Sequence, residues 1–224
     1  MMLAEKLRAG LAELALDLSE HQQKQLLDYL AMIAKWNKVY NLTAIRDAGE
    51  MLTHHLLDSL AVITPLQRHL DGLHADASKA YRLLDVGAGA GLPGVVIAIC
   101  CPHISVLCVD TVGKKAAFIQ QVALALGLAN LRGVHARVEQ MLPVDVRGGF
   151  DVITSRAFAT LEDFVGLTEG LLISSSGVWM AMKAKTVGVE TAHLPEDIAA
   201  FHVEHLTVPY LDEDRNLVWI RQLH

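Results

Sequence analysis

Cysteine is scarce in this chain of 224 residues, which holds only Cys100, Cys101 and Cys108. Three cysteines without a CxxC pair do not suit a disulfide framework or a zinc knuckle, and they fit buried, reduced thiols. The sequence therefore predicts a protein that needs neither disulfides nor a metal.

Long apolar runs are missing as well. The longest one, Val95 to Cys101, follows Gly94 and ends at Pro102, well short of the roughly 20 residues that a membrane-spanning helix requires. The first residues, Met1 to Gly10, lack the basic-then-apolar order of a secretory signal. We expect no membrane segment and a cytoplasmic location.

Positive charge is in deficit, with 19 Lys and Arg against 25 Asp and Glu and a net charge of -6. Non-specific coating of nucleic acid depends mostly on neutralising phosphates, so this balance argues against it. The net charge does not exclude a localised basic face. The candidate clusters are Lys35, Lys38 and Arg46; Lys114 and Lys115; Arg132, His135 and Arg137; and Lys183 and Lys185.

Half of the chain is apolar, which allows one principal domain with a smaller appendage. From Leu3 to about Asn37 the apolar residues recur at helical spacing, and a further short helix is expected across Gly49 to Ile63. The polar stretch Asp71 to Lys79 is the predicted boundary. It divides a helical segment, 1–78, packed on the core, from a main domain, 79–224.

The main domain alternates strands with helices, which predicts a parallel sheet with right-handed crossovers. Helical stretches begin near Leu92, Gly113 and Leu161. The four predicted strands are Arg82 to Val86, Ser105 to Val109, Leu131 to His135 and Phe150 to Thr154.

The tail departs from this alternation. We expect a fifth strand at Gly177 to Met182, a helix at Leu194 to Phe201 with Pro195 in its first turn, and then two strands, His202 to Val208 and Arg215 to Leu223, joined as an antiparallel hairpin. This α/β layout, a mostly parallel sheet with a hairpin at one edge and helices before it, resembles the Rossmann-like fold of class I methyltransferases.

A glycine-rich turn follows the first predicted strand, within Leu83 to Gly94. In an open α/β sheet, ligands bind beyond the carboxyl ends of the strands, where glycines let a ligand approach the backbone. Gly87, Gly89 and Gly91 supply such a turn, and Pro93 suits the start of the next helix.

Two cofactors compete for this turn, because Gly89 to Gly94 also satisfies the dinucleotide pattern GxGxxG, which is weak evidence on its own. Asp85 favours S-adenosylmethionine, since a carboxylate there would hold the methionine ammonium, directly or through water, and would repel a pyrophosphate. Asp110, at the end of the second strand, would accept hydrogen bonds from ribose hydroxyls in either case. A turn without a ligand would leave both carboxylates unexplained.

Further segments resemble one protein family more specifically than the glycine turn does. They are Trp36 to Thr43, His54 to Leu60, Asp110 to Phe118, Arg137 to Glu139, Ser155 to Ala159 and Leu217 to Ile220. Together they resemble the bacterial 16S rRNA guanine-N7 methyltransferase family (RsmG/GidB) over nearly the whole chain. The resemblance implies methylation at N7 of a guanine in the decoding-region loop of 16S rRNA, with S-adenosylmethionine as cofactor and 16S rRNA or the small ribosomal subunit as partner.

The resemblance also implies cofactor-binding residues. With the carboxylates and the turn, the set is Asp85, Gly87, Gly89, Leu92, Asp110, Val138, Glu139 and Arg156. We expect no catalytic residue, because guanine N7 has an in-plane lone pair and carries no proton at neutral pH. The task is to hold N7 in line with the methyl group.

Five residues are candidates for contact with RNA, each with a plainer alternative. Phe158 would stack on an extruded base or pack in the core. Lys114 opposes the dipole of its helix, which favours a phosphate contact over a solvated lysine. Arg137 fits phosphate or the cofactor carboxylate. Asn41 would face substrate or cap a turn.

His54 is the fifth candidate. It shares a helix face with Asp58 at a spacing of four residues, so the pair suggests a surface contact, a substrate contact or a metal, but two ligands do not make a metal site. Two other functions remain open for the chain: a noncatalytic binding module with this fold, and a methyltransferase for a small molecule. We expect a monomer.

Overall fold

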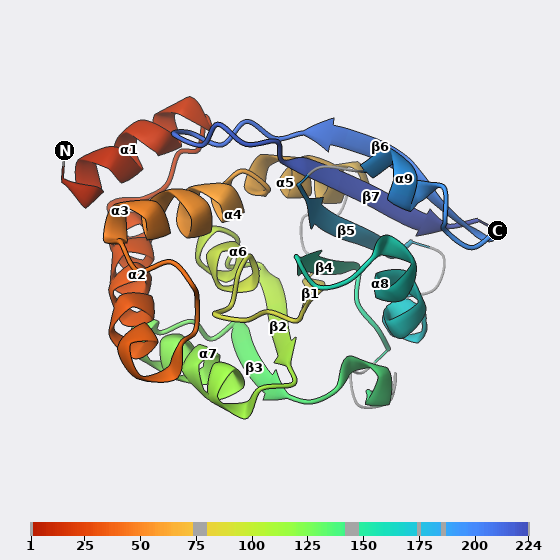
Figure 1. Cartoon of the computed structure of the whole chain (residues 1–224), viewed down its shortest axis with the longest axis horizontal. Helices are drawn as coiled ribbons and strands as arrows, with labels where there is room; N and C mark the ends of the chain where they lie inside the picture. Colours follow the sequence, from red (N-terminus) through yellow and green to blue (C-terminus); the bar gives the residue numbers. More distant parts are fainter. Residues whose placement is uncertain (1, 74–79, 142–147, 174–175, 185–186, 224) are drawn as a thin grey trace.

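A computed structural model describes residues 2–73, 80–141, 148–173, 176–184 and 187–223. The described strands form a seven-stranded sheet in the order β3-β2-β1-β4-β5-β7-β6 (Figure 1). They are β1 Tyr81–Val86, β2 Ile104–Asp110, β3 Leu131–His135, β4 Val152–Arg156, β5 Val178–Lys183, β6 Ile198–His205 and β7 Asn216–Gln222. The first five are parallel to one another, and β7 runs antiparallel between β5 and β6.

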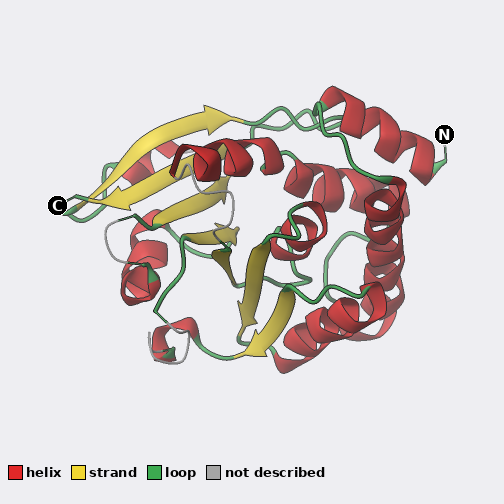
Figure 2. Cartoon of the chain, turned by 180° about the vertical axis from the view of Figure 1, so that it is seen from behind, coloured by secondary structure: helices red, strands yellow, loops and turns green. Residues whose placement is uncertain are grey.

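The helices that precede the sheet are α1 Leu3–Glu13, α2 Glu20–Tyr40, α3 Ala48–Met51, the π-helix η1 Leu52–Leu57, α4 Asp58–Leu60 and α5 Ile63–Leu73. Later helices are α6 Gly94–Cys100, α7 Gly113–Leu126, η2 Val138–Gln140, α8 Leu161–Thr168, η4 Glu169–Leu171 and α9 Val187–Thr191. Helices α1 to α3 gather at the side of the molecule opposite to the C-terminus (Figure 2). Within the described ranges, no helix is both long and apolar enough to cross a membrane.

Each face of the sheet carries its own apolar core. Leu83 belongs to one core and Leu84 to the other, because successive side chains of a strand point to opposite faces. The first core is shared with the N-terminal helices: Leu26 and Ile33 of α2 are buried in it together with Phe118 of α7. The N-terminal helices thus pack directly on the sheet domain.

The predicted fold class is confirmed, including the antiparallel hairpin at one edge, but details of the elements differ. Helix α5 continues to Leu73, inside the predicted boundary, and the rest of that boundary, 74–79, lies outside the described residues. The division at residue 78 stays a prediction. Strand β4 begins at Val152, because Phe150 instead forms an isolated bridge with Leu172.

The predicted helix Leu194 to Phe201 is wrong. Its second half is the start of β6, where Ile198 pairs with Gln222 of β7. A turn precedes the strand, closed by the N–H of Ile198 donating to the carbonyl of Pro195 at 3.0 Å. Pairing with a distant strand has overridden the local helical pattern. The strand continues to His205 past a register irregularity between Ala200 and His202.

Candidate active site

The glycine-rich turn connects β1 to α6 and depends on backbone conformations that favour glycine. Gly87, Gly89 and Gly91 have φ angles of 65°, 60° and 93°. A Cβ atom on Gly87 would lie 2.4 Å from Cδ2 of Phe158, and one on Gly91 would lie 2.4 Å from Cγ2 of Val95. The turn therefore has both the conformation and the close packing that exclude other residues.

Asp85 lies behind the turn, fully buried. The N–H of Gly94, at the start of α6, donates to its Oδ2 at 2.9 Å, while Oδ1 has no hydrogen-bond partner among the described residues. Burial raises the pKa of this carboxyl from 3.8 to about 7. A buried acceptor left open in this way fits the ammonium of a bound methionine moiety, reached directly or through water.

Asp110, at the end of β2, fastens the tip of the turn. The N–H of Gly89 donates to its Oδ2 at 2.9 Å, and the N–H of Val112 donates to its Oδ1 at 2.8 Å. Lys115, in the first turn of α7, places Nζ 3.8 Å from Oδ2. That carboxylate offsets the unfavourable position of a lysine near a helix N-terminus.

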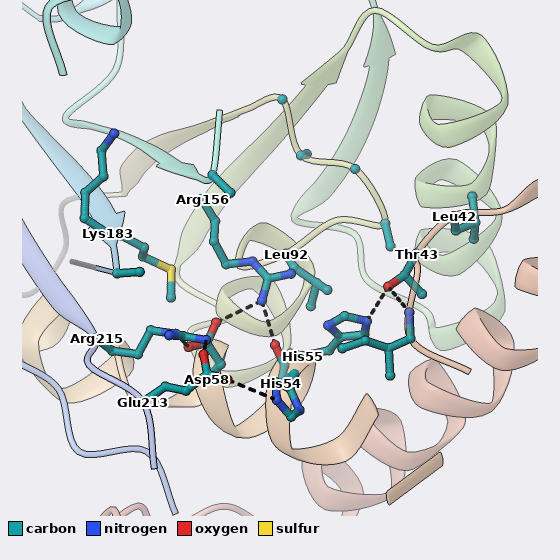
Figure 3. Close-up of a pocket in the computed structure, with 18 of the residues that line it drawn as sticks. Leu42, Thr43, His54, His55, Asp58, Leu92, Arg156, Lys183, Glu213 and Arg215 are labelled. Carbon is teal, nitrogen blue, oxygen red and sulfur yellow. Dashed lines mark hydrogen bonds and ion pairs between the residues drawn. The ribbon is translucent and has the colours of Figure 1, made fainter. Parts of the chain in front are cut away.

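Two adjoining cavities lie over the turn, at the carboxyl ends of β1, β2 and β4, and Gly87 and Ala157 border both. The smaller has a volume of about 230 Å³ and is lined by Asp110, Val138 and Phe158 among others. The larger has a volume of about 640 Å³ and includes Thr43, His54, His55, Asp58, Leu92, Arg156, Lys183, Glu213 and Arg215 (Figure 3). Together they form a two-part cleft in the position expected of a ligand site.

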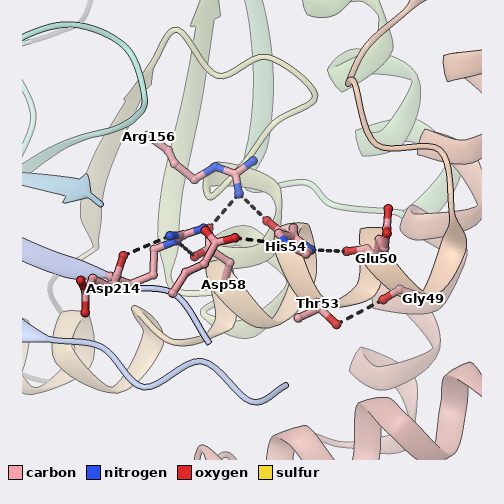
Figure 4. Close-up of polar contacts among 9 residues, drawn as sticks. Gly49, Glu50, Thr53, His54, Asp58, Arg156 and Asp214 are labelled. Carbon is pink, nitrogen blue, oxygen red and sulfur yellow. Dashed lines mark hydrogen bonds and ion pairs between the residues drawn. The ribbon is translucent and has the colours of Figure 1, made fainter. Parts of the chain in front are cut away.

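Asp58 is the centre of an ion-pair network in the larger cavity (Figure 4). Its Oδ2 accepts from Nη1 of Arg156 and its Oδ1 from Nε of Arg215, both at 2.9 Å. Nη1 of Arg156 also donates to the carbonyl of His54 at 2.8 Å. Only 3% of the Asp58 side chain is exposed, so these two arginines compensate a buried charge. Two guanidinium groups around Asp58 would also repel a metal ion, which removes the metal alternative for His54 and Asp58.

His55 borders the same cavity from the π-helix, a form that often occurs at functional sites. Its Nε2 lies 2.9 Å from Oγ1 of Thr43, and Nδ1 has no partner in the described part of the chain. Burial, assisted by the positive charge of Arg156, lowers the pKa of His55 to about 4. The imidazole is therefore neutral at physiological pH.

The structure brings together most of the predicted site residues. Gly87, Gly89, Leu92, Arg156 and His54 line the larger cavity, and Asp110, Val138, Glu139 and Phe158 line the smaller one with Gly87. Phe158 is partly buried and packs edge-on against Phe164, with ring centroids 6.5 Å apart. Its ring lies on the Asp110 side of the cleft and not in the larger cavity.

Four predicted residues lie outside the walls of both cavities: Asp85, which is buried behind the turn, and the three exposed residues Asn41, Lys114 and Arg137. Asn41 is exposed and ends α2 in the left-handed conformation, with a φ of 49°. Lys114 is exposed on α7, and Arg137 is exposed with its Nε 2.6 Å from Oε1 of Glu139. The three exposed positions flank the cleft and leave a role in binding RNA as a prediction.

Sequence reasoning missed the ion pairs of Asp58 and the place of His55 in the cavity. Both residues stand inside the segment His54 to Leu60 that carried the family resemblance, but that segment did not indicate that Asp58 pairs with arginines. Arg215 carried no signal in the sequence, because this residue stands in a hairpin loop 157 positions from Asp58. Nothing in a local pattern indicates that such distant residues meet.

The sheet order and the two-part cleft around a glycine turn define a class I methyltransferase. A family model described as "GidB: rRNA small subunit methyltransferase G" matches residues 22–218. The chain belongs to this family, as the resemblance predicted.

Curated relatives and solved structures agree with this assignment. A protein of Albidiferax ferrireducens named Ribosomal RNA small subunit methyltransferase G is 60% identical over 224 residues, covering 98% of this chain and 97% of its own length. One of the same name from Acidovorax sp. (strain JS42) is 58% identical, covering 96% and 93%. The crystal structure of Burkholderia thailandensis 1,6-didemethyltoxoflavin-N1-methyltransferase shares the fold, with a TM-score of 0.58, 15% identity and coverage of 88% and 90%.

Proposed function

We propose that this protein transfers a methyl group from S-adenosylmethionine to N7 of a guanine in the decoding-region loop of 16S rRNA. The observation that carries the proposal is the adjoining of two cavities at Gly87 and Ala157 in a member of an rRNA methyltransferase family. The smaller cavity suits a nucleoside, and the larger one has room for a second planar group beside it.

The residues of the cleft fit the cofactor. Asp110 carries its carboxylate into the smaller cavity where ribose hydroxyls would donate, and Val138 adds an apolar wall for adenine. The Oδ1 of Asp85, unpaired within the described chain and buried behind the turn, suits the ammonium of the methionine end, reached directly or through water. The guanidinium of Arg156, in the larger cavity, suits its carboxylate. The full proposed set is Asp85, Gly87, Gly89, Leu92, Asp110, Val138, Glu139 and Arg156. The cofactor supplies an electrophilic methyl group on a sulfonium.

Transfer to guanine N7 requires no general base, because the attacking lone pair carries no proton. The pKa of His55, lowered to about 4, makes this imidazole a weak base, and Asp58 is paired with two arginines, so both residues agree with a site built for positioning. We assign no residue as a proton acceptor. Substrate contacts are proposed for His54 in the larger cavity, for Phe158 in the wall of the smaller one, and for Asn41, Lys114 and Arg137 around the cleft.

We further propose that the protein is a monomer that acts in the cytoplasm, where its rRNA substrate is found. Lys114 and Arg137 would contact phosphates of the RNA around the target base. Their exposed positions beside the smaller cavity support this arrangement.

The test is to incubate the full chain with S-adenosylmethionine labelled in its methyl group and with small ribosomal subunits from bacteria that lack this activity. A parallel reaction uses protein-free 16S rRNA. Digestion and chromatography then identify the modified nucleoside and its position. We expect 7-methylguanosine in the decoding-region loop. Labelling of a small metabolite instead, or cofactor binding without any transfer, would refute the proposal.

A further inference from the structure

Glu213 stands in the loop between β6 and β7 and lines the larger cavity. Its Oε2 lies 3.0 Å from Nη2 of Arg215, which is itself held by Asp58. Its Oε1 lies 3.9 Å from Nε2 of His54, beyond hydrogen-bond distance. One oxygen of this carboxylate is thus anchored, and the other is open to the cavity.

Two other carboxylates line the same cavity, and both are already engaged. Asp58 is only 3% exposed and accepts from two arginines. Glu190 is 23% exposed, and its Oε2 accepts from the N–H of Leu161 at 2.9 Å and lies 2.7 Å from Nζ of Lys183. The Glu213 side chain, at 55%, is far more exposed. Among the described carboxylates of this cavity, Glu213 is the one best placed to accept from a ligand.

Guanine presents matching donors. When N7 faces the methyl donor, the N1–H and the N2 amino group lie on the remote edge of the base and point the same way. The two oxygens of a carboxylate can accept the N1–H and one hydrogen of the N2 amino group side by side. The oxygen of Glu213 that is paired with Arg215 still has a second lone pair for one of these bonds. Adenine has an unprotonated N1 there, which a carboxylate repels. In Figure 3, Leu92 of the turn and Glu213 lie on opposite sides of Asp58 and the tip of Arg156.

We propose that Glu213 is a specificity-determining residue that accepts hydrogen bonds from N1–H and the N2 amino group of the target guanine. This inference rests on the function proposed above. Methylation at N7 makes the ring cationic and N1–H a stronger donor. The contact with Glu213 therefore strengthens as the methyl group is transferred, which favours turnover as well as binding.

The experiment combines a change in the protein with a change in the base. Small subunits are reconstituted with 16S rRNA that carries either guanosine or inosine, which lacks the N2 amino group, at the target position. Rates are measured for wild type, Glu213→Gln and the control Asp212→Asn, which makes the same charge change in the same loop, outside the larger cavity. Calorimetry with S-adenosylmethionine checks that the cofactor site is intact.

For wild type we expect inosine to lower kcat/KM by about 10-fold, the effect of one charge-assisted hydrogen bond. Glu213→Gln should lower kcat/KM on guanosine by roughly 100-fold and bring the guanosine-to-inosine ratio close to one. Asp212→Asn should keep both the rate and the ratio.

Two results would overturn the inference. A Glu213→Gln variant with a wild-type rate on guanosine would show that the contact is absent. A slower variant that keeps the wild-type guanosine-to-inosine ratio would show that Glu213 acts only through the fold. Both results leave the proposed function intact. Failure of the wild-type protein to methylate N7 of guanosine would instead refute the proposed function, and the inference with it.

Discussion

The hydroxyl of Tyr29, on α2, donates a hydrogen bond to the carbonyl of Ala90 in the glycine turn at 2.7 Å, and the carbonyl of Gly91 lies 3.3 Å from the same oxygen. Tyr29 is fully buried, and burial raises its pKa well above the ordinary value, so it remains a donor at physiological pH. The N-terminal segment therefore supports the cofactor turn from behind, through a contact between residues 61 positions apart.

Tyr29→Phe should leave the buried carbonyl of Ala90 without its donor. We expect a loss of about 1–2 kcal/mol in the free energy of unfolding and weaker binding of S-adenosylmethionine, because the turn loses its support. Urea denaturation and calorimetry measure the two effects. Tyr40→Phe removes a hydroxyl from the exposed end of the same helix and should change neither. Equal effects of the two variants would contradict the role assigned to Tyr29.

Asp58→Asn should be strongly destabilising. It removes the charge between Arg156 and Arg215 and leaves two partly buried guanidinium groups facing each other. We expect a loss of roughly 3 kcal/mol in the free energy of unfolding, together with loss of methyl transfer. The control is Asp28→Asn, which removes an exposed partner of Lys24 and should cost about 0.5 kcal/mol or less. Urea denaturation of both variants tests the difference.

Gly94→Ala tests the packing beneath the turn. An added Cβ would lie 2.5 Å from Sγ of Cys108 and 2.7 Å from Oδ2 of Asp85, so the start of α6 must shift. We expect a loss of about 2 kcal/mol in stability and reduced cofactor affinity. Gly166→Ala, in α8, where the new Cβ meets no atom of the described residues within 4 Å beyond its own helix backbone, should instead stabilise by roughly 0.5–1 kcal/mol. Thermal denaturation should shift the two variants in opposite directions.

Asp85 should make the stability of the cofactor-free protein depend on pH. Its pKa is about 7 in the fold against an ordinary 3.8, so between these values the folded chain holds a proton that the unfolded chain has released. Its contribution is present at low pH and is lost as pH rises through about 7, with a slope of at most roughly 1.4 kcal/mol per pH unit.

The comparison that isolates this slope is wild type against Asp85→Asn, unfolded in urea at a series of pH values. As pH rises, the unfolding free energy of wild type should fall relative to that of Asp85→Asn. A difference that does not vary with pH would mean that Asp85 titrates normally in the fold.

The sequence predicts this fold well where each pattern is local. Segments such as Ser105 to Val109 are short, mostly apolar and bounded by turns, and the observed strand β2 extends this one by a single residue at each end. The segment that starts at Leu194 was misjudged because its alternation is weak and its conformation is set by pairing with β7. The local sequence of a strand does not indicate which distant strand it pairs with.

The site divides in the same way. Asp85, the glycines and Asp110 could be predicted because a strand end and its turn are continuous in sequence. The contacts of Asp58 with Arg156 and Arg215, 98 and 157 positions away, depend on the assembled sheet and hairpin. The position of Glu213 depends on Arg215, which Asp58 holds. Only the structure could therefore indicate Glu213 as a substrate contact.

The Asp58 network joins the N-terminal helices, the centre of the sheet and the last hairpin, which has a consequence for synthesis. A chain still emerging from the ribosome can form β1, the glycine turn and α6 long before Arg215 exists. The ion pair between Asp58 and Arg215 in the larger cavity cannot form until that hairpin has been made and has folded back. The protein thus completes its larger cavity only at the end of its own translation.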